Sequence, residues 1–116
     1  MGENCPLDRD KLGYHTWSLI HTMVAYYPDE PTPQHRAQIT EFLKLLGDLY
    51  PCRACGEDFS RLLNTWPPIT DSQSTLSHWL CLIHNEVNKK TNKPIFDCSL
   101  VDERWKYGWK DGSCDY

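Results

Sequence analysis

The 116-residue sequence predicts an all-α protein, a four-helix bundle with a short fifth helix lying across it. Strand signals are nearly absent, because no window alternates apolar and polar residues between turn signals. Apolar residues at helical spacing recur five times, and short connections join the four longer stretches. The length predicts one domain over residues 1–116, in which residues 1–6 or so form a segment ahead of the first helix.

The first two helices are delimited by caps and prolines. Asp8 can cap the first helix and Pro28 ends it; Thr32 can cap the second, with Pro33 at its first position. The expected apolar face of the first comprises Leu12, Leu19, Ile20, Met23 and Tyr27. That of the second comprises Ile39, Phe42, Leu43, Leu46 and Leu49, before Pro51 separates it from the third.

The third helix is expected from the cysteines at positions 52 and 55 to Trp66, where two prolines stop it. Its expected apolar residues are Phe59, Leu62, Leu63 and Trp66. The fourth is expected over about 75–90 and buries Leu76, Trp79, Leu80, Ile83 and Val87. A short fifth helix is expected to begin near Cys98 or Ser99.

Charge and hydropathy exclude two classes of partner. The net charge is −4 and the lysines and arginines are scattered, so no nucleic-acid partner is expected. Apolar stretches are broken every few residues, far short of the roughly 20 that a membrane span needs, so no membrane insertion is expected. The first residues contain neither an apolar nor an Arg-rich targeting segment.

The motif Cys52-Arg53-Ala54-Cys55 is the strongest chemical signal among the six cysteines. At the start of a helix, two thiols at this spacing can form a small, reducible disulfide, and the free N–H groups there favour a thiolate. Half of a zinc site and a purely structural bridge are alternatives. Cysteine usage indicates an oxidising or redox-active compartment.

Three polar or aromatic stripes accompany this motif. The fourth helix carries Cys81, His84, Asn85 and Asn88 on one face, where a polar ligand can lie. The other stripes are Trp17 and His21 beside Gly13 and Tyr14, and Trp105 and Trp109 beside Lys106 and Lys110. Solvated faces and core filling are the alternatives. Together the stripes indicate a large planar cofactor with polar edges.

A zinc site and a thioredoxin-like redox site are two alternative interpretations of these cysteines. Cys52 and Cys55 followed by Cys81 and His84 can form a tetrahedral zinc site, although the gap between the pairs is long. A thioredoxin-like site needs a strand before the motif, which this sequence does not supply. We therefore expect no metal.

Four segments in order carry a more specific pattern: GYHTWSLIHT at 13–22, YPCRAC at 50–55, WLCLIHNEVN at 79–88 and VDERWKYGWKDGSC at 101–114. They resemble the ALR/Erv family of FAD-linked sulfhydryl oxidases over essentially the whole chain from Cys5. The resemblance implies a homodimeric helical bundle that holds FAD at its mouth. It also implies that protein thiols are oxidised and that electrons pass to oxygen, giving hydrogen peroxide, or to cytochrome c.

The resemblance assigns roles to particular residues. It implies that Cys52 exchanges with substrate while Cys55 faces the flavin, that Cys81 and Cys98 form a structural disulfide, and that Cys5 and Cys114 link subunits. The residues it implies for FAD are Arg9, Gly13, Trp17, His21, His84, Asn85, Val87, Asn88, Lys90, Lys93, Trp109 and Lys110. Cys81 joins this set if its disulfide borders the cofactor.

The resemblance also implies a compartment and a partner. It favours the mitochondrial intermembrane space, with the disulfide donor of the import pathway as thiol substrate, and cytosol or secretion for a short form. A non-enzymatic, disulfide-stabilised helical module with growth-factor-like properties is the competing hypothesis.

Overall fold

The computed structural model describes residues 4–115; residues 1–3 of the expected N-terminal segment and Tyr116 lie outside this range. Its four long helices are α1 (Arg9–Ala25), α2 (Pro33–Leu49), α3 (Arg53–Thr65) and α4 (Gln73–Lys90). A 3₁₀ turn, η1 (Cys98–Leu100), and a short π-helical turn, η2 (Glu103–Tyr107), follow them. Residues 4–115 contain no strand. The all-α prediction is therefore confirmed, as is a short helical segment that begins at Cys98.

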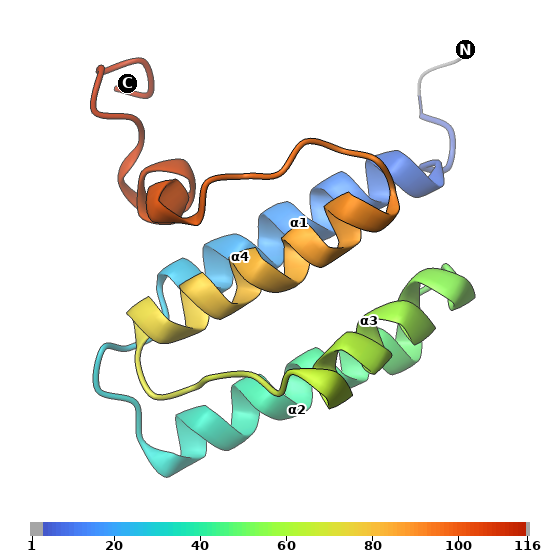
Figure 1. Cartoon of the computed structure of the whole chain (residues 1–116), viewed down its shortest axis with the longest axis horizontal. Helices are drawn as coiled ribbons and strands as arrows, with labels where there is room; N and C mark the ends of the chain where they lie inside the picture. The colour runs from blue at the N-terminus through green and yellow to red at the C-terminus, as the bar shows by residue number, and fades with distance from the viewer. Residues whose placement is uncertain (1–3, 116) are drawn as a thin grey trace.

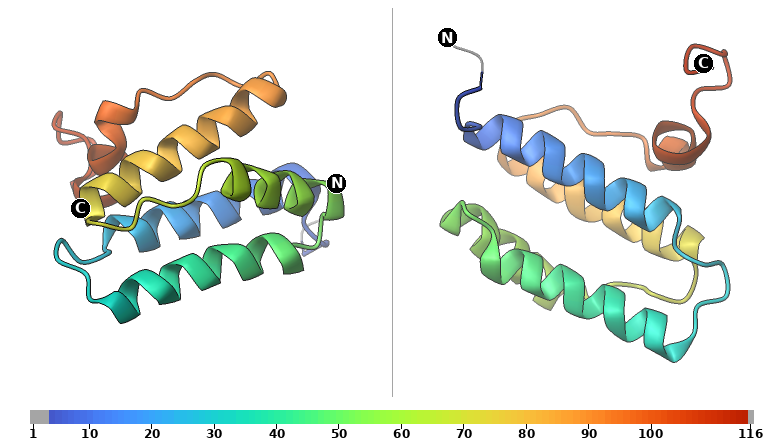
Figure 2. Two further views of the ribbon diagram at one scale, coloured as in Figure 1. Left: turned by 60° about the horizontal axis from the view of Figure 1, so that its bottom comes forward. Right: turned by 180° about the vertical axis from the view of Figure 1, so that it is seen from behind.

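The helices pack as two pairs, α1 beside α4 and α2 beside α3 (Figure 1). After α4 the chain runs back along that helix as an extended segment, and then η1 and η2 follow (Figure 2). Figure 1 looks nearly down the axis of η2, so this turn crosses the long helices, and η2 contacts α1. The C-terminal segment therefore closes over the α1–α4 pair, as the sequence predicts.

Side-chain caps start the long helices. Asp8 and Thr32 cap α1 and α2, as predicted. The predicted start of the fourth helix is two residues late, because α4 begins at Gln73. Ser72 Oγ accepts a hydrogen bond from the backbone N–H of Thr75 at 3.2 Å, and Thr75 Oγ1 accepts one from the N–H of Ser72 at 3.1 Å. This reciprocal cap satisfies two N–H groups and sets the start of the helix.

The buried core joins all four long helices. It consists of Ile20, Val24, Tyr27, Leu43, Phe59, Leu76, Trp79, Leu80 and Ile83. The predicted apolar face of α1 is partly wrong, because Leu19 and Met23 are 59% and 41% exposed. Leu49, at the end of α2, and Trp66, just after α3, are also exposed. α1 has apolar residues on two sides, and periodicity alone does not show which side meets a neighbour.

Two glycines bring α2 and α3 close together. A Cβ added at Gly56 would overlap the carbonyl oxygen of Gly47, and one added at Gly47 would overlap Ser60 Oγ. Only a residue without a side chain permits this backbone approach. Because Gly56 directly follows Cys55, the contact fixes the start of α3, and therefore the CxxC motif, against α2.

No helix in residues 4–115 is both long enough and apolar enough to cross a membrane.

Candidate active site

The CxxC motif forms a disulfide at the N-terminus of α3. Cys52 and Cys55 are bonded, with their Cα atoms 5.3 Å apart. Cys52 is the N-cap of α3, and its sulfur lies 3.4 Å from the backbone nitrogen of Cys55. The first turn of a helix carries N–H groups without helical partners and the positive end of the helix dipole. A thiolate formed at this disulfide is therefore stabilised, as a redox-active pair requires.

Cys55 lies one helical turn before the buried Phe59, so their side chains project from the same face of α3. The Phe59 ring meets the Trp17 ring of α1 edge to face, with centroids 5.9 Å apart. This contact links the redox helix to α1. It places Cys55 on the side of α3 that faces the molecular interior.

Four aromatic rings, which we call the ring cluster, meet between α1, α4 and η2. Trp17 stacks on His84 with centroids 4.0 Å apart and planes 3° from parallel. His21 stacks on Trp105 with centroids 4.7 Å apart and planes 2° from parallel. Nε2 of His21 and Nδ1 of His84 are hydrogen-bonded at 2.9 Å, which joins the two stacks.

Both histidines of the ring cluster are neutral at pH 7. Burial, with smaller contributions from the nearby His84 and Arg104, lowers the pKa of His21 to about 3. Burial also lowers the pKa of His84 to about 4, with a smaller contribution from Lys93. In their hydrogen bond one imidazole therefore donates an N–H and the other accepts with a lone pair. The cluster combines flat aromatic faces with neutral hydrogen-bonding groups.

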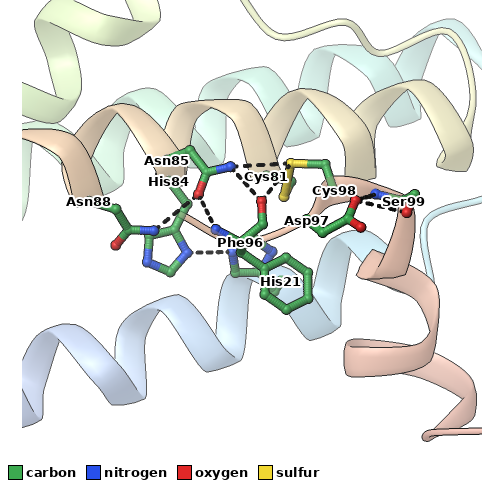
Figure 3. Close-up of a disulfide and its surroundings, with 9 residues drawn as sticks. All are labelled: His21, Cys81, His84, Asn85, Asn88, Phe96, Asp97, Cys98 and Ser99. Atoms are coloured by element: carbon green, nitrogen blue, oxygen red, sulfur yellow. Dashed lines mark hydrogen bonds between the residues drawn. A yellow bond between two sulfur atoms is a disulfide. The ribbon is translucent and has the colours of Figure 1, made fainter. Parts of the chain in front are cut away.

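A second disulfide and two asparagines hold the chain that returns along α4 (Figure 3). Cys81 and Cys98 are bonded, with Cα atoms 5.8 Å apart, which is the pairing that the resemblance implies. Nδ2 of Asn85 donates to the carbonyl oxygen of Phe96 at 2.9 Å, and Oδ1 accepts from the backbone N–H of Phe96 at 2.9 Å. Asn88 Nδ2 donates to the same Oδ1 at 3.1 Å. This amide pair therefore secures the extended segment.

The structure brings only part of the predicted cofactor set together. Trp17, His21 and His84 meet in the ring cluster, and buried Cys81, Asn85 and Asn88 lie on α4 beside it (Figure 3). Lys93 lowers the pKa of His84 and so adds positive charge near the cluster. Within residues 4–115, the remaining predicted residues form no hydrogen bond, ion pair or ring contact with the cluster: Arg9, Gly13, Val87, Lys90, Trp109 and Lys110.

Lys90 has another partner. Its Nζ donates to Oδ1 of Asp58 on α3 at 2.7 Å, and Asp58, whose side chain is only 16% exposed, also contacts Arg61. This ion pair joins α4 to the redox helix. It gives Lys90 a structural partner in addition to the cofactor role that the resemblance implies.

Trp105 and Arg104 are missing from the predicted set, although both belong to this site. The Arg104 guanidinium carbon lies 3.8 Å from the centroid of the Trp105 ring, which in turn stacks on His21. The sequence pairs Trp105 with Trp109 as neighbours on a regular helix. The turn η2 ends at Tyr107, and Gly108 follows it with a φ of 83°, so Trp109 lies outside the helix that the sequence expected to carry both tryptophans.

The disulfides argue against the zinc hypothesis. The three cysteines of that candidate site belong to two separate disulfides, Cys52–Cys55 and Cys81–Cys98. A cysteine binds zinc as a free thiolate, so a cysteine held in a disulfide is not a ligand. Within residues 4–115, no group of His, Cys, Asp and Glu side chains is arranged to hold a metal ion.

The fold and the site define a class of protein, a helical thiol–disulfide redox domain with an aromatic cofactor-type site. Residues 14–106 match the model of the Erv1/Alr family. The FAD-linked sulfhydryl oxidase ERV1 of Oryza sativa subsp. japonica is 43% identical over 95% of this chain and 57% of its own length. The mitochondrial FAD-linked sulfhydryl oxidase ERV1 of Saccharomyces cerevisiae is 40% identical over 91% of this chain and 56% of its own. This chain belongs to the Erv1/Alr family, and it spans a little over half the length of these two relatives.

Solved structures agree with this assignment. The structure of the yeast Erv1 core aligns with a TM-score of 0.91 and 38% identity, over 95% of this chain and 93% of that one. The FAD-binding domain of Erv1 from Saccharomyces cerevisiae aligns with a TM-score of 0.87 and 39% identity, over 90% of this chain and all of that one.

Proposed function

We propose that this chain is an FAD-dependent sulfhydryl oxidase that forms disulfides in protein substrates. The observation that carries the proposal is the Cys52–Cys55 disulfide at the N-terminus of α3, on a helix that contacts the ring cluster through Phe59. The family and the names of the relatives support the same activity. In this proposal, protein thiols are the substrate, FAD is the cofactor, and electrons pass from the thiols through the Cys52–Cys55 pair to FAD.

The residues around the ring cluster fit FAD. Trp17, His84 and Trp105 supply flat aromatic surfaces, and the neutral imidazoles supply hydrogen-bonding groups for the polar edge of a flavin. A Cβ added at Gly13, one turn before Trp17, would meet nothing within 4 Å, so this strip of α1 is open to a ligand. Arg104 and Lys93 provide positive charge for a pyrophosphate. We retain the residues Arg9, Asn85, Val87, Asn88, Lys90, Trp109, Lys110 and Cys81 as further proposed contacts.

Substrate oxidation begins at Cys52. A substrate thiolate attacks Cys52 Sγ, which forms a mixed disulfide and breaks the Cys52–Cys55 bond. Cys55 leaves as a thiolate, and the N–H groups of the first turn of α3 stabilise its charge. The second substrate thiol then attacks the mixed disulfide and releases Cys52. The substrate has lost two electrons and two protons, and the cysteine pair has gained two electrons.

Reoxidation of the pair needs an electron acceptor on the inner side of α3, where Cys55 projects. FAD, when bound, supplies two-electron redox chemistry there and connects the dithiol to a final acceptor. On this side of α3 the buried Phe59 ring meets Trp17 of the ring cluster. For the final acceptor we propose oxygen, giving hydrogen peroxide, or cytochrome c.

The test is the visible spectrum of the purified protein, recorded before and after dithiothreitol is added without oxygen. A flavin spectrum that bleaches and returns in air is expected. Cys55→Ser should retain FAD and lose its reduction by dithiothreitol. A protein that reconstitution with FAD cannot colour, or a Cys55→Ser variant reduced at the wild-type rate, would refute the proposal. A protein that does not take up FAD would favour a non-enzymatic interaction module.

A homodimer is the proposed assembly. α1 exposes Leu19, Met23 and Tyr26 at helical spacing, and α2 exposes Leu45 and Leu49. Exposed apolar stripes of this kind are typical of association surfaces. Sedimentation should therefore give a dimer, and a Leu19→Glu, Met23→Glu variant should sediment as a monomer.

Cys5 and Cys114 are the proposed intersubunit cysteines. The start of α1 and the segment after η2 lie at opposite ends of the long axis (Figures 1 and 2), so a bond between these cysteines joins two chains rather than one. Replacing both with Ala should remove covalent dimers from a non-reducing gel while association remains.

The proposed compartment is the mitochondrial intermembrane space, with the disulfide donor of the import pathway as the protein substrate. One yeast relative is named as mitochondrial, which supports the organelle. For a short form of the protein, we propose a cytosolic or secreted location. Fractionation of cells that express the tagged protein tests the compartment.

A further inference from the structure

A cavity of about 460 Å³ lies between α2 and α3, and its lining includes Arg53, which follows Cys52 in the chain. Tyr50 and Arg53, which flank the Pro51–Cys52 step, line its near end. None of its lining residues belongs to the ring cluster. The cavity is therefore separate from the proposed FAD site, and one end of it lies at the residues that flank the Pro51–Cys52 step.

The cavity is elongated along α3. Arg53, Glu57, Arg61 and Asn64 line it at helical spacing. The eleven residue steps from Arg53 to Asn64 correspond to about 16 Å at roughly 1.5 Å per residue. An extended polypeptide covers the same length with about five residues, at roughly 3.3 Å each. The site therefore matches a short segment of extended chain.

The lining is polar and suits a polypeptide backbone. Tyr50 and Ser60 contribute hydroxyl groups and Asn64 contributes an amide, so the walls both donate and accept hydrogen bonds. Gly47 contributes no side chain to the α2 wall, where the two helices approach most closely.

All but one of the charged residues that line the cavity form ion pairs. Arg53 Nε donates to Glu57 Oε1 at 3.0 Å, and Arg61 contacts Asp58. Asp48 is the one charged lining residue that forms no ion pair within residues 4–115. Its carboxylate is therefore available to a cation brought by a ligand, and it repels an anion.

We propose that this cavity binds the polypeptide segment next to the reactive cysteine of the substrate, and that Asp48 selects a segment with a basic side chain. The inference rests on the proposed oxidase function, because it assigns the cavity to the substrate of that reaction. A thiol held here by its flanking residues is positioned for attack on Cys52. A small dithiol has no such flanking residues.

The test uses two synthetic peptide dithiols that differ only in Lys or Glu beside the cysteines. The ratio of their kcat/KM values is measured with the FAD-loaded protein, for wild type and for Asp48→Lys. Because both peptides are measured with the same variant, the ratio of their kcat/KM values does not depend on how well that variant folds, binds FAD or carries out the chemical step. Glu41→Lys is the matched control, because it makes the same charge change on the same helix, two turns from Asp48 and outside the cavity.

Wild type is expected to prefer the Lys peptide, and Asp48→Lys is expected to shift the ratio toward the Glu peptide by about tenfold. Glu41→Lys should keep the wild-type ratio. An unchanged ratio in Asp48→Lys, or an equal shift in Glu41→Lys, would overturn the proposal.

A second assay separates this proposal from the proposed function. In a Cys55→Ser variant, Cys52 attacks peptides whose cysteine is activated as a 2-thiopyridyl disulfide, which forms the Cys52–peptide disulfide and releases pyridine-2-thione. This exchange requires no FAD. If no peptide is oxidised by the wild-type protein, the oxidase proposal fails. The Lys-to-Glu ratio of the exchange rates, with and without Asp48→Lys, still decides whether the cavity selects the substrate.

Discussion

Acidification from pH 7.5 to pH 5.0 should destabilise this protein strongly through the two histidines of the ring cluster. The native pKa is lowered to about 3 for His21 and about 4 for His84, mainly because both rings are buried. An exposed imidazole in the unfolded chain has a pKa of about 6.5. Between about pH 4 and 6.5 the unfolded chain therefore binds two protons that the native state does not bind.

This difference in bound protons determines how the free energy of unfolding changes with pH. Stability falls as pH decreases wherever the unfolded state binds more protons. Each proton contributes about 1.4 kcal/mol per pH unit, so each histidine lowers the free energy of unfolding by about 2 kcal/mol between pH 6.5 and 5.0. The pair together lowers it by about 4 kcal/mol, a large part of the roughly 5–15 kcal/mol typical of a domain. Carboxylates titrate mainly below this window.

The assay is urea unfolding across this pH range at a fixed FAD concentration. His84→Gln removes one titrating ring and keeps a hydrogen-bonding group toward His21. This variant should lose about half of the pH dependence, or about 2 kcal/mol. His78→Gln is the control, because His78 is exposed on the same helix. If His84→Gln retains the wild-type pH dependence, the two histidines are not the buried neutral pair described above.

Two further predictions concern the interior contacts of the site. Trp105→Ala removes the ring that stacks on His21, and FAD affinity measured by flavin fluorescence should fall by about three- to tenfold; the half-exposed Trp66→Ala should leave it unchanged. Lys90→Gln and Asp58→Asn should each cost up to about 1 kcal/mol of stability, with a coupling of about 0.5–1 kcal/mol in the double-mutant cycle. A loss of FAD affinity in Lys90→Gln without that coupling would assign Lys90 to the cofactor instead.

The parts of this fold that the sequence predicts correctly depend on local chemistry. Asp8 and Thr32 correctly predict where two helices start, because a side-chain oxygen can accept hydrogen bonds from free N–H groups within the same turn. The apolar spacing in α4 identifies Leu76, Leu80 and Ile83 as buried, and they are. The position of the Cys52–Cys55 disulfide at a helix start is also local, because both cysteines and the helix terminus lie within four residues.

The errors and omissions occur where the partner lies far along the chain. Leu19 and Met23 fit a helical stripe as well as Val24 does, yet only Val24 is buried, because the neighbours of α1 determine which face is covered. The sequence also does not show that the Asn85 amide bonds the backbone of Phe96, eleven residues later. Lys90 pairs with Asp58 across a gap of 32 residues.

The sequence by itself determines the helical class, the position of the redox motif at a helix start, and a set of aromatic and polar residues suited to a planar cofactor. Only the tertiary structure decides which of those residues meet. It stacks Trp17 on His84 and His21 on Trp105, and it leaves a cavity between α2 and α3, the two helices that Gly47 and Gly56 let approach. The physical reason is that caps and periodicity act within a few residues, whereas ring stacks and cavities depend on how separate helices pack.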